Sequence, residues 1–446
     1  MGGRTTVILI TLCLGMAALS YIAHPLAPLA VLVGFWFLVV GVRSPFFLLI
    51  CFVFYLIGRL ADFIPVLGAL GAGKYLALAA LGLLIVAKLI DRDLSFVRST
   101  YNKWLLMLTG AILLSIFLGS NSQLGIDWFF KEFIKTLFLF FLIVNLVTTP
   151  RYVVIFQICL GVICSALGGY TLLAQLLGHD PLTGAAMVEG SRAGGVGALV
   201  DPNDVAMVML MATPFWLVAL IEIKGWRRGL FALLFLLGAG GILATQSRGG
   251  LLGLTAGFGL IASRYVKNKV VVGTTAAIFL AVVVAVAGIS GRSSGGDMET
   301  IDSSAQGRLD AWQAGIRMVV RHPLTGVGFL QFPNNFAQYA PSSSGWHRIA
   351  THNSYIQVAS ETGLLGFIPF MVLIYFSLRH AIRLGRDRSD EGTPTILDAV
   401  KSSALPCLVS LLAAAFFLSN GWTAYLYILF GFGAATANVF DLDDAV

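Results

Sequence analysis

The sequence predicts an all-α polytopic membrane protein with twelve to fourteen transmembrane helices. Its 446 residues are 58% hydrophobic and only 11% charged, whereas soluble globular proteins carry about 25% charged residues. Apolar runs of about 20 residues, the length that crosses a bilayer as a helix, recur along the whole chain. No segment shows the alternating pattern of a transmembrane β-strand, and backbone groups in lipid must be paired internally. Helices are therefore the expected structure.

Fourteen apolar segments are candidate spans, and the third and the last two set the lower limit of twelve. The first, which follows Arg4, is expected to be retained as a helix because other spans follow it at once. The spans divide the chain into 1–176, 177–289, a large external loop at 290–351, and 352–446. They are 6–23, 26–41, 45–60, 74–90, 104–119, 127–148, 152–176, 204–222, 229–245, 249–263, 270–289, 353–378, 402–419 and 421–440.

Clusters of basic residues in short loops predict the orientation. Counting spans between the four clusters places all of them on one side, which the positive-inside rule makes cytoplasmic, together with both termini. This rule explains most of the net charge of +7, so no nucleic-acid partner is expected. The clusters contain Lys88, Arg92, Arg98 and Lys103; Lys224, Arg227 and Arg228; Arg264, Lys267 and Lys269; and Arg379, Arg383, Arg386, Arg388 and Lys401.

Three loops lie on the opposite, external side: 177–203, the tight turn 245–250 and the long stretch 290–351. The long loop has a flexible start, SGRSSGGDMET, and continues with an amphipathic helix from Gly307 that Pro323 ends. We expect this helix to lie along the membrane interface. Its apolar face carries Leu309, Trp312, Ile316 and Val320, and its polar face carries Asp310, Gln313, Arg317 and Arg321.

No metal or other cofactor is expected from the sequence. The cysteines lie inside apolar spans without a CxxC pattern, so they are interpreted as packing residues rather than metal ligands or disulfides. The external loops show no carboxylate pair or His/Cys cluster with metal-ligand spacing. The five cysteines are Cys13, Cys51, Cys159, Cys164 and Cys407.

Arg248 is the external arginine that the orientation rule explains least. It stands in the turn 245–250 between two apolar spans, where an unpaired charge is costly. Gly249 and Gly250 follow it and leave room for a bulky group at the backbone. The alternative is an arginine that snorkels to the interface from a helix end.

Three other external arginines, Arg192, Arg308 and Arg348, also fall outside that rule. Arg308 opens the amphipathic helix and could simply bind anionic lipid headgroups. Arg192 precedes a glycine-rich run and the sequence DPND, which indicates a loop and a helix start. Asp201 and Asp204 in that sequence are interpreted first as capping residues.

A polar stripe opens the apolar segment 353–378. Asn353, Gln357 and Glu361 are spaced by four residues and share one helix face, with His352 at the external end. Inside lipid, such a stripe must face other helices or a water-filled cavity. Two interpretations stay open: polar contacts between helices with a capping histidine, or the floor of a reaction chamber at the membrane surface.

Arginines that converge near the membrane surface suit a diphosphate on a lipid carrier, because guanidinium groups bind phosphate oxygens in pairs. Histidine titrates near neutral pH and can accept the proton of an attacking hydroxyl. Diphosphate is a good leaving group whose growing charge the arginines would stabilise, so a metal is not required.

The C-terminal half resembles the bacterial O-antigen ligase and polymerase family, membrane glycosyltransferases that act on undecaprenyl-diphosphate-linked glycans. The resemblance covers about residues 190–370, and the histidine–asparagine helix start is its most specific part. The matching segments are 192-RAGGVGALVDPND-204, 246-QSRGGLLG-253, 307-GRLDAWQAG-315, 325-TGVGF-329 and 352-HNSYIQVASETGLLG-366.

The resemblance implies a helical, GT-C-like fold and an inverting transfer that needs neither metal nor nucleotide. Arg248 and Arg308 would hold the donor diphosphate, and His352 would activate or orient the acceptor hydroxyl. The implied partners are an undecaprenyl-diphosphate-linked glycan, a lipid A core or glycan acceptor, and membrane lipids. The implied location is the periplasmic face of the bacterial inner membrane. Further substrate-binding candidates are Arg192, Asn353, Gln357 and Glu361.

The sequence leaves ligase and polymerase open, and the complete family pattern favours a ligase. The alternative from another class is a transporter or flippase of a lipid-linked solute, which should show two related halves and charges near the bilayer midplane. Lys131, Glu132 and Lys135 at the start of the sixth span favour it, but they can equally form ion pairs on a helix face.

Overall fold

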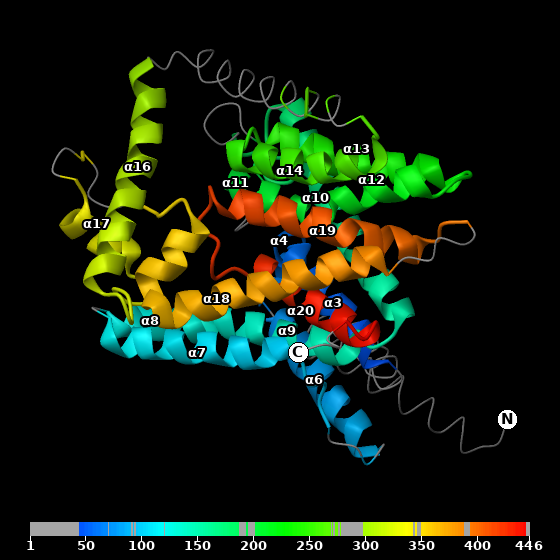
Figure 1. Cartoon of the computed structure of the whole chain (residues 1–446), viewed down its shortest axis with the longest axis horizontal. Coiled ribbons are helices and arrows are strands. Elements are labelled where there is room, and N and C mark those ends of the chain that lie inside the picture. Colours follow the sequence, from blue (N-terminus) through cyan, green and yellow to red (C-terminus); the bar gives the residue numbers. More distant parts are fainter. Residues whose placement is uncertain are drawn as a thin grey trace, which may run out of the picture.

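The computed structural model describes residues 44–69, 71–90, 92, 95–119, 121–186, 193–194, 201–268, 270, 273–274, 277, 298–341, 344–345, 349–387 and 393–442. Every regular element in these ranges is helical, which confirms the all-α class (Figure 1). The elements are α3 (Pro45–Ile57), α4 (Leu60–Phe63), α5 (Pro65–Ala69), α6 (Ala72–Ile90), α7 (Thr100–Leu118), α8 (Ser122–Trp128), the π-helical η1 (Phe129–Phe133), α9 (Ile134–Leu146), α10 (Pro150–Leu177), α11 (Pro202–Leu210), α12 (Thr213–Glu222), α13 (Arg227–Ala244), α14 (Arg248–Tyr265), α16 (Met298–Arg321), α17 (Phe332–Tyr339), α18 (Ser354–Arg386), α19 (Ile396–Ala415) and α20 (Ala424–Val439).

Seven stretches of the described chain are long and apolar enough to cross a membrane: α6, α7, α10, α11 with α12, α13, α18 and α19. The shorter apolar helices α3 and α20 add to them. Each predicted span inside the described ranges coincides with one helix or a run of consecutive helices. The predicted spans 6–23 and 26–41 lie outside the described residues, and so does the span 270–289 apart from residues 270, 273–274 and 277.

The predicted span 402–419 is shifted along the chain, because α19 begins at Ile396 and ends at Ala415. Its early start has a local cause. Thr395 and Asp398 form a capping box, in which the side chain of each residue accepts a hydrogen bond from the backbone N–H of the other. A search for apolar runs does not detect polar capping residues of this kind.

Small residues allow the long helices to pack closely. A Cβ at Gly253 or Gly257 of α14 would collide with Ser410 of α19. Likewise, Gly168 of α10 and Gly241 of α13 meet backbone to backbone. Such small-residue contacts are the usual means by which membrane helices approach one another, since burial from water cannot drive their association.

α18 is broken at Gly363, whose φ of 61° and ψ of −163° are not helical. The segment 323–328 crosses the helix at this break. Its carbonyls at Pro323 and Leu324 accept hydrogen bonds from the amides of residues 364 and 365, and the carbonyls of Ser360 and Glu361 accept from residues 327 and 328. The crossing segment therefore replaces helical hydrogen bonds that the break removes. This contact explains why TGVGF and ETG belong to one pattern.

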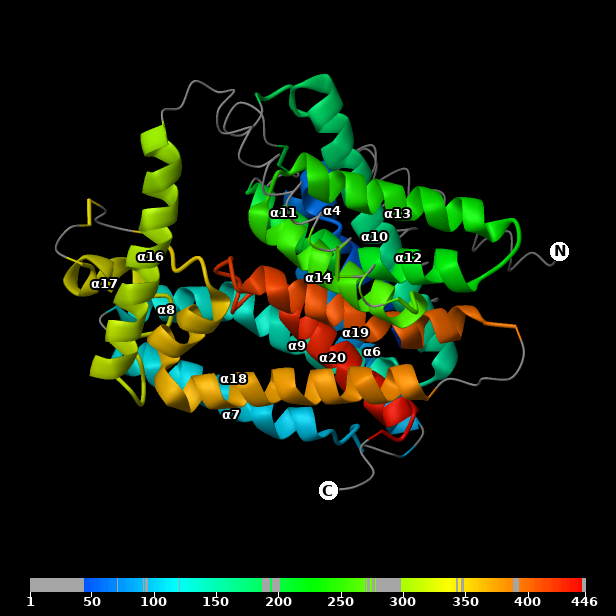
Figure 2. The same cartoon turned by 45° about the horizontal axis from the view of Figure 1, so that its top comes forward.

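The long external loop contains a helix, as predicted, that ends at Arg321 shortly before Pro323. α16 runs across one end of the long helices α7, α18 and α19 in both views (Figures 1 and 2). This crossing is the arrangement expected of a helix that lies along a membrane surface.

Two details of the predicted helix were wrong. It begins at Met298, inside the stretch expected to be flexible, and Asp310 of the predicted polar face is buried and accepts a hydrogen bond from Gln306. α16 packs inward through only part of its apolar residues. Ala311, Ala314 and Met318 are buried, whereas Leu309, Ile316 and Val320 are exposed by 56%, 58% and 74%.

Basic residues of the four clusters gather at the end of the bundle opposite to α16. Arg264 of α14 donates to the carbonyl of Gly385, and Lys401 of α19 pairs with Asp387. Tyr101, at the start of α7, is hydrogen-bonded to His380 in the second half of α18. The span count that put the clusters on one side thus agrees with the arrangement of these helices.

The charged group at the sixth span forms local ion pairs. Lys135 pairs with Glu132 at 3.0 Å, and Lys131 lies 3.5 Å from Asp127, all on one exposed helix face. These contacts fit the boundary interpretation, and they give the transporter alternative no support.

Candidate active site

The starts of three helices, the middle of α16 and one turn meet at the end of the bundle that α16 crosses. The turn, residues 416–423, joins α19 to α20 and is named here the 416–423 turn. It contacts α11, α14, α16 and α18, so it is the common wall of the candidate site.

The start of α18 is tied to this turn by three short polar contacts. The backbone N–H of His352 donates to Ser419 Oγ at 2.7 Å. Ser354 donates to the carbonyl of Leu418 at 2.6 Å and accepts from the N–H of Asn420 at 2.9 Å. These contacts fix the backbone on either side of the imidazole.

His352 itself has a left-handed backbone, with φ at 47°. A non-glycine residue there is under strain of about 1–3 kcal/mol, which the surrounding contacts must offset. Gln246, two residues before Arg248, has the same conformation at φ 50°. Both strained residues adjoin candidate catalytic residues, which is where such conformations concentrate.

The helix cap is Asn353 and not the histidine, contrary to one of the two sequence interpretations. Asn353 Oδ1 accepts from the amides of Tyr355 and Ile356 at 2.9 and 3.0 Å. The His352 side chain therefore does not cap the helix, and its ring is half-buried beside the cap.

Two charges act on the His352 ring. Burial lowers the pKa of this imidazole most, the positive charge of Arg308 lowers it further, and the negative charge of Asp201 raises it. The net shift is downward, so the neutral imidazole that can accept a proton is favoured at neutral pH. The charge of Arg308 thus acts on the His352 ring, and the catalytic roles of both residues stay predictions.

α16 brings Arg308 to this position through its packing. Trp312, one turn after Arg308, packs edge-on against Phe416 of the 416–423 turn with ring centroids 5.4 Å apart. A Cβ at Gly315 would overlap Ile356 of α18. Both contacts anchor the middle of α16 against the start of α18.

The starts of α11 and α14 are joined to each other and to the same turn. Ser247, the N-cap of α14, donates to Asn203 at 2.7 Å. Asp201 caps α11 by accepting from the N–H of Asn203, as predicted, and Asp204 accepts from Asn420 at 2.7 Å. Asp201 therefore combines a capping role with a charge that acts on His352.

Arg248 begins α14 directly after the Ser247 cap, and its side chain is exposed. The next residue, Gly249, packs against the turn, since a Cβ there would lie 3.1 Å from Phe417 Cβ and 3.7 Å from Leu418 Cγ. The carbonyl of Leu418 in turn holds Ser354. Arg248 and His352 thus start helices that pack on the same short turn.

The predicted polar stripe is buried and engaged with this turn. Gln357 Oε1 accepts from the N–H of Gly421 at 3.1 Å, and Glu361 accepts from Trp422 Nε1 at 2.7 Å. These are the inter-helix contacts that one sequence interpretation proposed. Direct contact of Asn353, Gln357 or Glu361 with a substrate stays a prediction.

Arg192 lies outside the described residues, as do Arg348 and His347. The neighbouring Ala193 donates its N–H to the carbonyl of Ala244 at 3.3 Å, close to the turn that leads to Arg248. The role of Arg192 stays a prediction.

Ser419, Asn420 and Trp422 were not predicted from the sequence, although they join the turn to α11 and α18. The stretch SNGW held a usable signal, because Asn-Gly marks a turn and the neighbouring polar groups interrupt two apolar runs. The helix ends at Ala415 and Ala424 leave this turn eight residues long.

Comparison with known proteins agrees with the resemblance noted from the sequence. Residues 233–371 match the family model described as O-antigen ligase. The chain is also 27% identical over 243 residues to the exopolysaccharide production protein ExoQ of Rhizobium meliloti (strain 1021), a match that spans 50% of this chain and 53% of that protein. Arg248, Arg308 and His352 lie inside the matched segment, and Arg192 lies before it.

Proposed function

We propose that this chain, whose residues 233–371 belong to the O-antigen ligase family, is a glycosyltransferase of polysaccharide biosynthesis. It moves a glycan from undecaprenyl diphosphate to an acceptor hydroxyl, on a lipid A core or a similar molecule, at the periplasmic face of the inner membrane. The observation that carries the proposal is the coupling of Arg308 and Asp201 to the half-buried His352.

In the proposed reaction, Arg308 and Arg248 bind the diphosphate of the donor lipid. His352 accepts the proton of the acceptor hydroxyl as its oxygen attacks the anomeric carbon from the face opposite the diphosphate. The bond from that carbon to the diphosphate oxygen breaks, and the configuration inverts. The guanidinium groups stabilise the charge that develops on the leaving diphosphate.

The electrostatics of the site make the base responsive to the donor. Without donor, the Arg308 charge lowers the pKa of His352. A bound diphosphate would neutralise this charge, so His352 would become a stronger base when the leaving group is in place. Burial of the ring keeps it unprotonated until then.

The orientation supports the external placement. Basic residues of the four clusters lie at the end of the bundle opposite to the site, as the positive-inside rule requires of a cytoplasmic end. Since α16 lies across the other end, its exposed apolar residues would contact the outer leaflet, where a lipid-linked donor has its diphosphate.

The experiment is reconstitution of the full chain in proteoliposomes with an undecaprenyl-diphosphate glycan and candidate acceptors. Transfer of the labelled glycan to lipid A core is the expected product. Without any covalent product from this or another hydroxyl acceptor, the transferase proposal fails.

A second candidate function is polymerisation of repeat units on the carrier. The relative named for exopolysaccharide production favours it, and the same site would serve, with a second lipid-linked glycan as acceptor. In the same reconstitution, a ladder of longer glycans on the carrier identifies a polymerase.

A further inference from the structure

A second cavity lies at the end of the bundle opposite to the candidate active site. It has a volume of about 340 Å³ and opens between α14, α18 and α19. One part of its wall is apolar, with Leu260, Ile382 and Leu405, and its rim carries Arg264 and Arg386. No residue of the proposed transfer reaction lines it.

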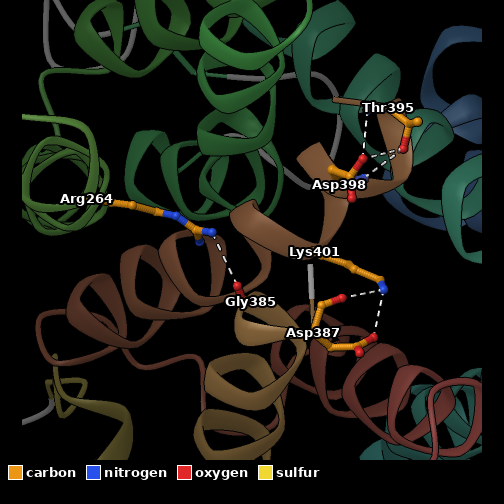
Figure 3. A network of polar contacts seen from close by, with 6 residues as sticks. All are labelled: Arg264, Gly385, Asp387, Thr395, Asp398 and Lys401. Carbon is orange, nitrogen blue, oxygen red and sulfur yellow. Dashed lines mark hydrogen bonds and ion pairs between the residues drawn. The ribbon is translucent and has the colours of Figure 1, made fainter. Parts of the chain in front are cut away.

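The two rim arginines have no carboxylate partner among the residues that the structure describes. Arg264 donates to the backbone carbonyl of Gly385 at 3.2 Å, and this contact ties the end of α14 to α18 (Figure 3). Asp387, which follows Arg386 directly, pairs instead with Lys401 at 2.7 Å. The carboxylate of Asp387 is therefore already paired with another base.

Two hydroxyl groups also line the cavity. Ser402 is 3% exposed, and its hydroxyl interacts with that of Tyr265. Tyr265 in turn donates its hydroxyl to Glu222, a carboxylate outside the lining. The cavity thus places two hydroxyl groups beside two cationic groups, which is a setting for an anion.

The helices around the cavity indicate which class of anion it would bind. α14, α18 and α19 pack as neighbouring helices of the bundle, and Ile382 beside the cavity is 40% exposed on the bundle surface. Basic pockets between transmembrane helices at the membrane edge suit lipid headgroups, and apolar helix surfaces below them suit acyl chains. A soluble anion would make no favourable contact with the apolar part of the wall.

We propose that this cavity binds the headgroup of an anionic phospholipid of the adjacent leaflet. Arg264 and Arg386 bind the phosphate, Ser402 donates to one of its oxygens or to the glycerol, and an acyl chain lies along Leu260 and Leu405. The lipid would join the ends of three helices whose opposite ends border the candidate active site.

The test is native mass spectrometry of the purified full chain with phosphatidylglycerol or phosphatidylcholine at equal concentrations. Wild-type protein is expected to retain phosphatidylglycerol at least about tenfold more strongly. The double variant Arg264→Gln/Arg386→Gln should bind it about thirtyfold more weakly, from the usual contribution of two basic residues at a membrane surface. The matched control Lys224→Gln/Arg227→Gln removes two exposed charges at the same end and should bind as wild type does.

Three results would overturn the proposal. They are equal retention of the two lipids, an equal loss in the control variant, and displacement of phosphatidylglycerol by inorganic phosphate alone. Tighter, arginine-dependent binding of undecaprenyl phosphate would assign the cavity to the carrier instead. Because lipid retention is measured without turnover, these outcomes are independent of whether glycan transfer occurs.

Discussion

At the scale of single residues, the proposed chemistry of the candidate site depends most on His352. Its backbone is strained, its N–H is held by Ser419, and its ring is half-buried between opposite charges. The sequence predicted the residue and its coupling to Arg308. It could not predict Ser419 or the influence of Asp201, because both depend on chain segments far away in the sequence.

The first prediction concerns pH. Activity requires neutral His352, whose pKa lies below its ordinary value of 6.5, so the acid limb of kcat/KM should lie below pH 6.5. Asp201→Asn keeps a capping side chain but removes a charge that raises this pKa, so the limb should move to lower pH. Arg308→Gln removes a positive charge that lowers the same pKa, so the acid limb measured on this variant's residual activity should move to higher pH. If both variants shift the limb in the same direction, His352 is not the group that titrates.

A second prediction separates phosphate binding from charge in general. Arg308→Gln should lower kcat/KM for the lipid-linked donor by about 10- to 100-fold, the usual effect of losing hydrogen bonds to a charged group. Arg321→Gln is the matched control, since it removes an exposed arginine at the far end of the same helix. Similar losses in both variants would mean that α16 contributes only overall charge.

At the scale of elements, the break in α18 holds the site in place. Four backbone hydrogen bonds join the residues on either side of Gly363 to the segment 323–328. The sequence contained both motifs, TGVGF and ETG, but their contact is a tertiary feature. Spacing of apolar residues predicts where a helix runs and cannot show that a distant loop will replace some of its hydrogen bonds.

The third prediction follows from this interlock. Gly363→Ala places a Cβ against the backbone of Leu324 and Thr325 and requires an alanine at φ 61° and ψ −163°, a conformation essentially restricted to glycine that costs about 1–3 kcal/mol. The purified variant should melt at a clearly lower temperature and lose transfer activity. Gly259→Ala in α14 is the control, because a Cβ there meets no other atom within 4 Å. An unchanged melting temperature for Gly363→Ala would contradict the described break.

At the scale of the whole molecule, the candidate site and the basic clusters occupy opposite ends of the helical bundle. Composition and charge predicted this arrangement well, because hydrophobic length and loop charge depend little on detailed packing. The 416–423 turn was missed, since two apolar runs separated by a few polar residues resemble a plain loop. Its importance comes from the number of helices that it contacts.

The fourth prediction tests the orientation by cysteine labelling in intact cells. Thr183→Cys, in an exposed loop at the site end, should react with a membrane-impermeant maleimide, and Lys224→Cys at the other end should react only after permeabilisation. Both variants are made in a Cys13→Ser background, because Cys13 lies outside the described residues, whereas Cys164 and Cys407 are buried and Cys51 and Cys159 are half-buried. The reverse labelling pattern would place the site on the cytoplasmic face.

The most direct test of the central claim is the rate of glycan transfer by reconstituted His352→Ala, with His179→Ala as an exposed control outside the site. Loss of a general base predicts a fall in kcat of at least about 10²-fold, with donor binding and melting temperature kept. The His179 variant should transfer at the wild-type rate. A His352→Ala protein that transfers glycan at more than half the wild-type rate would contradict the account.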